Sequence, residues 1–108
     1  MKITHETEGT AAIFTVCGQV DMHTSPELRG SLRKALEGRA TPLVVDLGQV
    51  SFIDSSGLAT LIEALQAVGR YVGNLRLCGL GPDVRKLFDL ARLSIIFDLR
   101  DNRDAALK

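Results

Sequence analysis

Short apolar runs recur along the chain and have the length and composition of β-strands. The first clear run, "AAIFTVC" at 11–17, is partly β-branched and ends before Gly18. A shorter run around Ile3 can pair with it as a hairpin across the turn "HETEGT". The run "PLVVDL" at 42–47 is interrupted only by Asp46, which is typical of a strand buried on both faces. Two later runs, "NLRLCGL" at 74–80 and "SIIFDL" at 94–99, predict two more strands.

The stretch that follows the first strand pair has the period of an amphipathic helix. Its apolar residues fall on one helical face, at Leu28, Leu32, Ala35 and Leu36. Two alternative signals mark the start. Ser25 can cap the helix with Pro26 at the first helical position, or Thr24 can pair with Glu27 as a capping box. Gly38 marks the end.

Two more helices and a weak terminal one are predicted further along. The second helix follows "DSSG", ends at Gly69 or Gly73, and carries apolar residues at Leu58, Leu61, Ile62, Leu65 and Val68. The third helix covers 82–93 and opens with Pro82. The segment "DNRDAALK" at 101–108 predicts a weak final helix.

The predicted order is therefore β-β-α-β-α-β-α-β, followed by the weak helix. Strands joined through single helices form right-handed parallel crossovers, and the initial hairpin adds an antiparallel edge. We therefore expect an α/β fold with a mixed, mostly parallel sheet packed with amphipathic helices. The chain has 108 residues, 45% of them hydrophobic, so residues 1–108 are expected to form one domain. In such sheets the loops after parallel strands share one rim, which here receives "GQVDMHTSP", "GQVSFIDSSG" and "CGLGPD".

Composition excludes several classes of partner. Thirteen basic residues balance thirteen acidic ones, and the chain has no Trp and one Tyr. It therefore has neither the net charge nor the aromatic platform for nucleic acid, and no net charge to attract an anionic membrane. The N-terminus "MKITHETEG" lacks the apolar core of a signal peptide, and no uncharged apolar stretch approaches the roughly 20 residues of a spanning helix. We expect a cytoplasmic protein without nucleic-acid or membrane partners.

The common signatures of cofactor and metal chemistry are missing. Cys17 and Cys78 stand alone in apolar runs and are interpreted as small buried residues. The sequence has no metal-ligand spacing, no phosphate-binding P-loop and no dinucleotide glycine fingerprint. We therefore expect no cofactor and no metal.

A cluster of polar residues, "DSSG" at 54–57, lies between a predicted strand and the second predicted helix. Its simplest interpretation is an N-cap, because a helix N-terminus has unpaired N–H groups. The same N–H groups and the helix dipole also favour an anion, so Ser55 or Ser56 could carry a phosphate without unfolding the domain. Residues alone do not decide between the two serines.

Three long segments resemble, over nearly the whole chain, a STAS domain of the bacterial anti-anti-sigma factor type. They are "GQVDMHTSPELRGSL", "PLVVDLGQVSFIDSSGLATLIEAL" and "LRLCGLGPDVRKLFDLARLSIIFDL". The resemblance implies an anti-sigma factor antagonist. Its unphosphorylated form binds an anti-sigma factor that is also a serine kinase, and so frees a sigma factor. Phosphorylation of one serine, which matches Ser55 here, ends that binding, and a PP2C-type phosphatase restores it.

The resemblance also implies a partner-binding surface. Asp21 matches the family's aspartate in the loop before the first helix, and His23 and Thr24 lie in the same loop. The remaining expected contacts are Asp54, Ser56 and Gly57, with Gly57 leaving room for a partner to approach the serine. Gln19 departs from the usual pattern, since a charged residue is common there. We expect a monomer or weak dimer.

Other functions stay open at this point. Within the same superfamily, the chain could be a subunit of a stress-signalling complex or an accessory component of a transport system. A serine hydrolase would use Ser55 or Ser56 with His23 as base, but the G-x-S-x-G elbow is absent. A phospho-aspartate receiver would need an acidic pair after the first strand, which is missing. We expect a binding protein that is not an enzyme.

Overall fold

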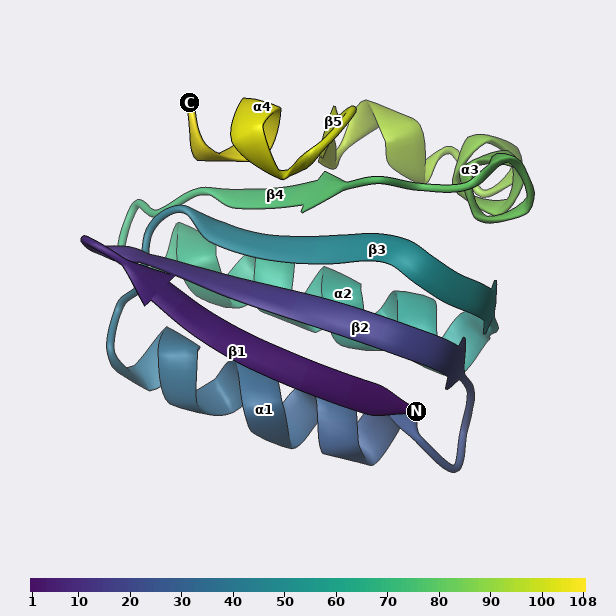
Figure 1. Ribbon diagram of the computed structural model, residues 1–108, viewed down its shortest axis with the longest axis horizontal. Helices are drawn as coiled ribbons and strands as arrows, with labels where there is room; N and C mark the ends of the chain where they lie inside the picture. The colour runs from purple at the N-terminus through teal and green to yellow at the C-terminus, as the bar shows by residue number, and fades with distance from the viewer.

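In the computed structural model, which describes residues 1–108, five strands form one sheet in the order β1-β2-β3-β4-β5 (Figure 1). The strands are β1 Lys2–Glu8, β2 Ala11–Val20, β3 Leu43–Ile53, β4 Leu75–Cys78 and β5 Asp98–Arg100. The helices are α1 Ser25–Glu37, α2 Ser55–Gly69, α3 Pro82–Leu90 and α4 Arg103–Leu107, with one 3₁₀ turn, η1, at Leu93–Ile95.

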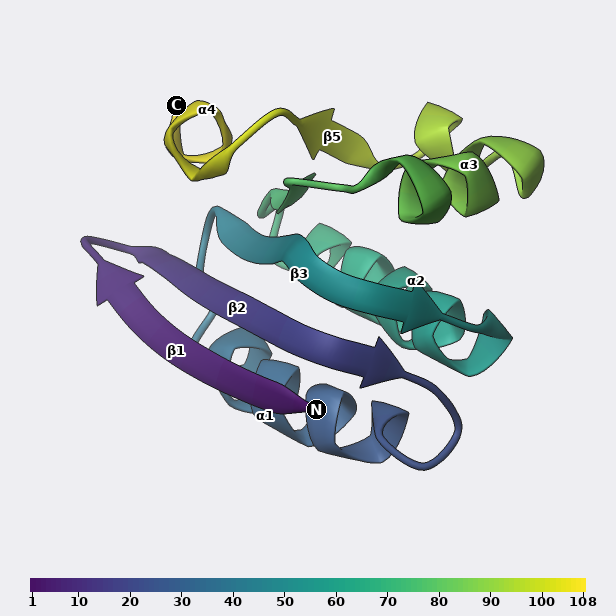
Figure 2. The ribbon, with the colours of Figure 1, turned by 45° about the vertical axis from the view of Figure 1, so that its right-hand side comes forward.

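The order of the strands places the connecting helices. β1 is antiparallel to β2, and β2 to β5 are all parallel. When right-handed crossovers join parallel strands in sequential order, their helices lie on the same face of the sheet. Figures 1 and 2 show α1 and α2 side by side behind β1, β2 and β3. The predicted fold class and element order are confirmed.

The main core lies between the sheet and these helices. β2 contributes Ala12, Phe14, Val16 and Val20, and β3 contributes Leu43, Val45, Leu47, Val50 and Ile53. They pack against Leu28 and Leu32 of α1 and Leu61, Ala64 and Val68 of α2. Each fully buried Leu or Phe stabilises the fold by about 1.5–3 kcal/mol relative to exposure. α3 adds Phe88, whose ring meets Phe97 edge-to-face at 5.6 Å.

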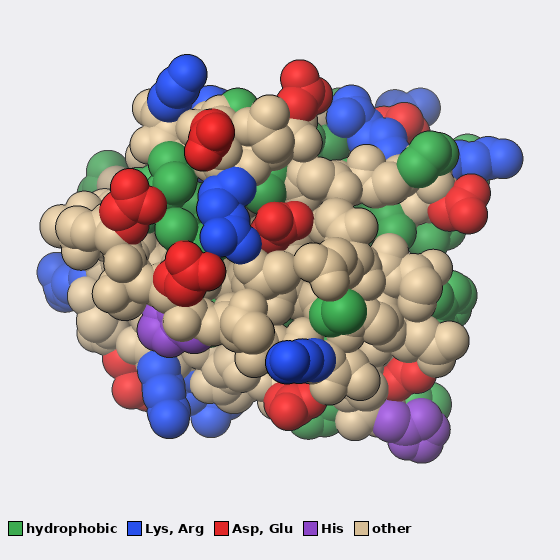
Figure 3. All heavy atoms as spheres, viewed as in Figure 1, with side chains coloured by type: hydrophobic (Ala, Val, Ile, Leu, Met, Phe, Trp, Pro, Cys, Tyr) green, Lys and Arg blue, Asp and Glu red, His purple; other side chains and the backbone are tan.

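The opposite face of the sheet is covered only in part, by α4. Ala106 of α4 is buried with Ile13, Val44 and Cys78, so "PLVVDL" is buried on both faces only where α4 covers it. Elsewhere this face carries charged side chains of both signs, interspersed without a large patch of one sign (Figure 3). No helix of the chain combines the length and the apolar composition needed to cross a bilayer.

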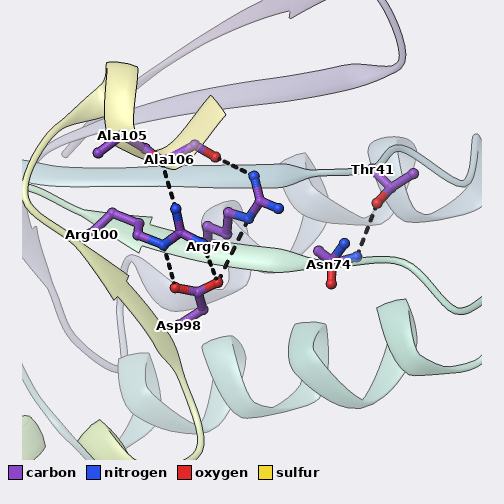
Figure 4. Close-up of polar contacts among 7 residues, drawn as sticks. All are labelled: Thr41, Asn74, Arg76, Asp98, Arg100, Ala105 and Ala106. Atoms are coloured by element: carbon purple, nitrogen blue, oxygen red, sulfur yellow. Dashed lines mark hydrogen bonds and ion pairs between the residues drawn. The ribbon is translucent and has the colours of Figure 1, made fainter. Parts of the chain in front are cut away.

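Two arginines attach α4 to the sheet (Figure 4). Arg76 donates to the carbonyl oxygen of Ala106 at 2.9 Å, and Arg100 donates to that of Ala105 at 2.8 Å. Asp98 lies between them, 2.6 Å from Nε of Arg100 and 3.7 Å from Nε of Arg76. The Nε atom of Arg76 is buried and forms no hydrogen bond. The negative charge of the nearby Asp98 carboxylate partly compensates for this.

β3 is longer than predicted, because it continues past residue 47 to Ile53. Between β2 and β3 the register shifts twice, so that Leu47, Val50 and Ile53 all face the core at a spacing of three. Bulges of this kind break the two-residue alternation that identifies a strand in a sequence. β2 is also longer than predicted and ends at Val20.

The prediction of a strand at 94–99 is wrong for most of its length. Arg92 has a left-handed backbone with φ of 59°, and the 3₁₀ turn η1 follows. Ile95 and Ile96 are 78% and 52% exposed, so this apolar run belongs to a turn, and only Asp98–Arg100 pairs with β4. Cys78 is buried as predicted, but Cys17 is only half-buried and donates to the side-chain oxygen of Gln49 at 3.2 Å.

Candidate functional site

Two loops meet where β2 and β3 end, at the right-hand edge of the sheet in Figure 1. One loop connects β2 to α1 and contains Asp21, and the other connects β3 to α2 through Asp54. The backbone N–H of Asp54 donates to the carbonyl of Val20 at 3.0 Å, which ties the loops together. The third predicted rim segment, "CGLGPD", takes no part in their hydrogen bonds. Two of the three rim loops therefore form the site.

Asp54 is the N-cap of α2. Its Oδ1 accepts hydrogen bonds from the backbone N–H groups of Ser56 at 2.9 Å and Gly57 at 3.1 Å. The hydroxyl of Ser56 also donates to Oδ1, at 2.6 Å. This hydroxyl and the N–H groups favour the ionised carboxylate and hold the pKa of Asp54 below its usual range. The site thus has a fixed negative charge next to Ser55.

The two serines of "DSSG" have different surroundings. The Ser56 hydroxyl is half-buried, donates to Asp54 and accepts from the hydroxyl of Ser25 at 3.3 Å. Ser25 is 4% exposed and begins α1, so this chain of hydroxyls joins the two helix starts. Ser55, the first residue of α2, is exposed and its hydroxyl belongs to none of these bonds. The N-cap that "DSSG" predicted is present, and Asp54 provides it.

Asp21 organises the other loop. Its Oδ1 accepts from the backbone N–H groups of His23 at 2.9 Å and Thr24 at 3.1 Å. The Thr24 hydroxyl donates to the carbonyl of Gln19 at 2.9 Å and accepts from the N–H of Asp21 at 2.9 Å. Thr24 occupies the N-cap position of α1 without a side-chain cap bond, so neither predicted capping arrangement, Ser25 nor the box with Glu27, is present.

Gly57 is buried, and a side chain at this position would point towards the sheet. A Cβ atom there would lie 2.6 Å from Cγ1 of Ile53 and 2.8 Å from Cγ1 of Val20. The expectation that Gly57 leaves room for a partner is therefore wrong. The glycine instead allows the first turn of α2 to pack closely on β2 and β3.

Two exposed apolar side chains flank the site, and sequence reasoning missed both. Met22 is 69% exposed in the Asp21 loop, and Phe52 is 47% exposed near the end of β3. Phe52 lies in the run "SFI", which is typical of strand interior, but the next residue, Ile53, faces the core, so Phe52 lies on the opposite, partly uncovered face of the sheet. Their only signal in the sequence was position, since both lie within three residues of a site aspartate.

The geometry does not resemble a hydrolytic or metal centre. The side chains of His5 and His23 are exposed, and the site serines bond to Asp54 and to one another, not to a histidine. His5 instead stacks on Phe14, with ring centroids 4.4 Å apart. No group of three or more His, Cys, Asp or Glu side chains is placed to hold a metal ion. The site therefore presents the exposed hydroxyl of Ser55 and the adjacent carboxylate of Asp54. The apolar side chains of Met22 and Phe52 flank them.

The profile of the STAS domain matches residues 2–106, so this chain belongs to the STAS domain family. It is 30% identical to the anti-sigma F factor antagonist of Paenibacillus polymyxa over 96 residues, which cover 88% of this chain and 82% of that protein. The crystal structure of an anti-sigma factor antagonist from Mycobacterium paratuberculosis matches with a TM-score of 0.90 and 27% identity, covering 98% of this chain and 90% of that one. The Bacillus cell fate determinant SpoIIAA in its phosphorylated form shares the fold, with a TM-score of 0.76, 21% identity and coverage of 94% and 92%.

Proposed function

We propose that this protein is an anti-sigma factor antagonist controlled by phosphorylation of Ser55. In its unphosphorylated form it binds an anti-sigma factor that is also a serine kinase, and a sigma factor is released. The observation that carries the proposal is the division between adjacent serines: Ser56 is held by Asp54 and Ser25, whereas Ser55 is exposed and free. The family and the names of its relatives agree with this role.

A phosphate at Ser55 is compatible with the fold. Ser55 is the first residue of α2, where the positive end of the helix dipole favours an anion, although Asp54 already accepts from the N–H groups of Ser56 and Gly57. The exposed hydroxyl can carry the phosphate into water without displacing a core side chain. The modification should therefore leave the free energy of unfolding nearly unchanged.

The same phosphate is expected to prevent partner binding. It adds about −1.5 to −2 charges next to the ionised Asp54. Burying that charge against a surface complementary to a neutral hydroxyl costs several kcal/mol, and each ~1.4 kcal/mol changes affinity tenfold. One modification thus suffices for an off-switch.

The proposal implies a cycle of partners. The anti-sigma factor adds the phosphate as a kinase, and a PP2C-type phosphatase removes it, because a phosphoserine does not revert unaided. Asp21, His23, Thr24 and Asp54 form the polar part of the proposed contact surface, and Met22 and Phe52 form its apolar part. Since sigma factors act on transcription, the protein would work in the bacterial cytoplasm, as a monomer or weak dimer.

Binding measurements with Ser55 variants test the proposal. Immobilised protein is used to capture the anti-sigma factor from the source bacterium, and its dissociation constant is then measured. We expect Ser55→Asp to weaken binding at least a hundredfold, while Ser55→Asn, of the same size but uncharged, retains most of it. Both variants should melt within a few degrees of the parent protein. Equal binding by Ser55→Asp, or capture of no anti-sigma factor, contradicts the proposal.

A further inference from the structure

A groove of about 470 Å³ runs between α1 and α2, on the face away from the sheet. Its floor is apolar, and consists of Leu32 and Leu36 from α1 and Ala64 and Ala67 from α2. The two side chains of α2 are small and leave the space above them unfilled. Leu32 and Ala64 are buried, so the apolar floor of the groove is accessible mainly at the half-buried Leu36 and Ala67.

Arginines dominate the edges of this α1–α2 groove. Arg29 and Arg33 of α1 and Arg70 after α2 line it, against a single acidic residue, Glu63. Arg29 pairs with Glu63 at 2.7 Å, with both side chains about half exposed. Arg33 and Arg70 are exposed and form no ion pair. The groove thus carries two unbalanced positive charges on a chain whose net charge is zero.

The groove also continues from the proposed phosphorylation site. Ser25 and Ser56 touch at the starts of α1 and α2, and one turn further along stand Arg29 and Thr60, which already line the groove. From Thr60 to Arg70 the channel follows about 15 Å of helix, at ~1.5 Å per residue. A protein that binds over Ser55 could therefore also contact this groove.

We propose that the α1–α2 groove binds an acidic, amphipathic segment of the anti-sigma factor. This inference rests on the proposed function and extends its interface from the loops to the helices. Apolar side chains of the segment would cover the floor, and its carboxylates would meet Arg33 and Arg70, which favours a peptide over a simple anion. The negative charge of Glu63 repels an acidic segment, and its ion pair with Arg29 weakens the attraction between Arg29 and that segment. Glu63 therefore lowers the affinity of the groove.

Charge reversal in the groove provides the first test. The probe is a fluorescein-labelled 15-residue amphipathic peptide with leucines on one helical face and glutamates on the other, followed by fluorescence polarisation at low salt. Arg33→Glu combined with Arg70→Glu should weaken binding at least tenfold, and Glu63→Gln should strengthen it roughly two- to threefold. The matched control, Lys2→Glu with Lys86→Glu, changes net charge equally at exposed sites outside the groove and should stay within twofold.

The second test uses the captured anti-sigma factor and the same variants. The groove double variant should weaken its binding at least tenfold with an unchanged melting temperature, and the control pair should bind like the parent. If the peptide does not bind, or if groove and control variants behave alike with either probe, the groove proposal is overturned. If no form of the protein binds an anti-sigma factor, the proposed function fails instead, so the two failures are distinguishable.

Discussion

Ser55 and Ser56 are neighbours in the chain, but folding gives them different surroundings. Ser56 is engaged by Asp54, two residues before it, and by Ser25, 31 residues before it. The contact with Asp54 could be expected from capping rules, although those rules also allowed a serine to be the cap. The contact with Ser25 depends on how α1 packs against α2, which no local pattern specifies. The sequence favours Ser55 only through the family resemblance, whereas in the structure Ser56 is hydrogen-bonded and Ser55 is exposed.

Gly57 gives a test at the scale of one residue. Gly57→Ala places a methyl group less than 3 Å from Ile53 and Val20, so we expect a loss of about 1–3 kcal/mol in the free energy of unfolding. The control is Gly30→Ala, because Gly30 lies in α1 with open space around its Cα. It should stabilise the protein by about 0.5–1 kcal/mol. Urea unfolding measures both, and a neutral Gly57→Ala would contradict the packing role.

Elements with a regular pattern were predicted well, and elements with an irregular one were not. α1 and α2 follow from their apolar period, and only the capping arrangement at the start of α1 was misassigned. β3 was predicted too short because its bulges change the side-chain spacing from two to three. The run at 94–99 has the composition of a strand. However, the left-handed backbone conformation of Arg92 starts a turn, and most of the run does not pair with β4. Bulges and turns of this kind arise from tertiary packing, so a local pattern does not contain them.

The short helix α4 gives a test at the scale of one element. It covers Cys78, and burial, reinforced by the charge of Asp46, raises the pKa of this thiol to about 11. We expect thiol reagents at pH 8 to modify Cys78 far more slowly in a Cys17→Ser background than in the unfolded chain. Ala106→Asp, which forces a charge under α4, should accelerate the reaction at least tenfold, whereas Ala105→Asp at a half-buried neighbour should not.

The pKa of Cys78 also gives stability a pH dependence. The folded value lies above the ~8.5 of an unfolded thiol, so the fold favours the protonated form. The contribution of Cys78 to stability is complete below pH ~8.5 and is lost as the pH rises from there towards 11. A Cys78→Ala variant should show a smaller loss over that range, and an identical decline in both proteins would contradict the assignment.

For the whole molecule, sequential parallel strands and right-handed crossovers bring the starts of α1 and α2 to one rim. This arrangement follows from element order alone, so the position of the site was predictable. The exposed Met22 and Phe52 and the α1–α2 groove were not, because they depend on which side chains the packing leaves uncovered. The proposed phosphorylation site is thereby separated from the core: the Ser55 side chain is exposed, while the residues that stabilise the rim lie beneath it.

Phosphate mapping tests the central claim most directly. The protein is incubated with the captured anti-sigma factor and ATP, and the modified residue is identified by mass spectrometry, alongside Ser55→Ala and Ser56→Ala. We predict phosphate on Ser55 in the parent protein and in Ser56→Ala, none in Ser55→Ala, and release of the anti-sigma factor as modification proceeds. Phosphate on Ser56, or undiminished labelling of Ser55→Ala, would contradict the assignment of Ser55 as the switch.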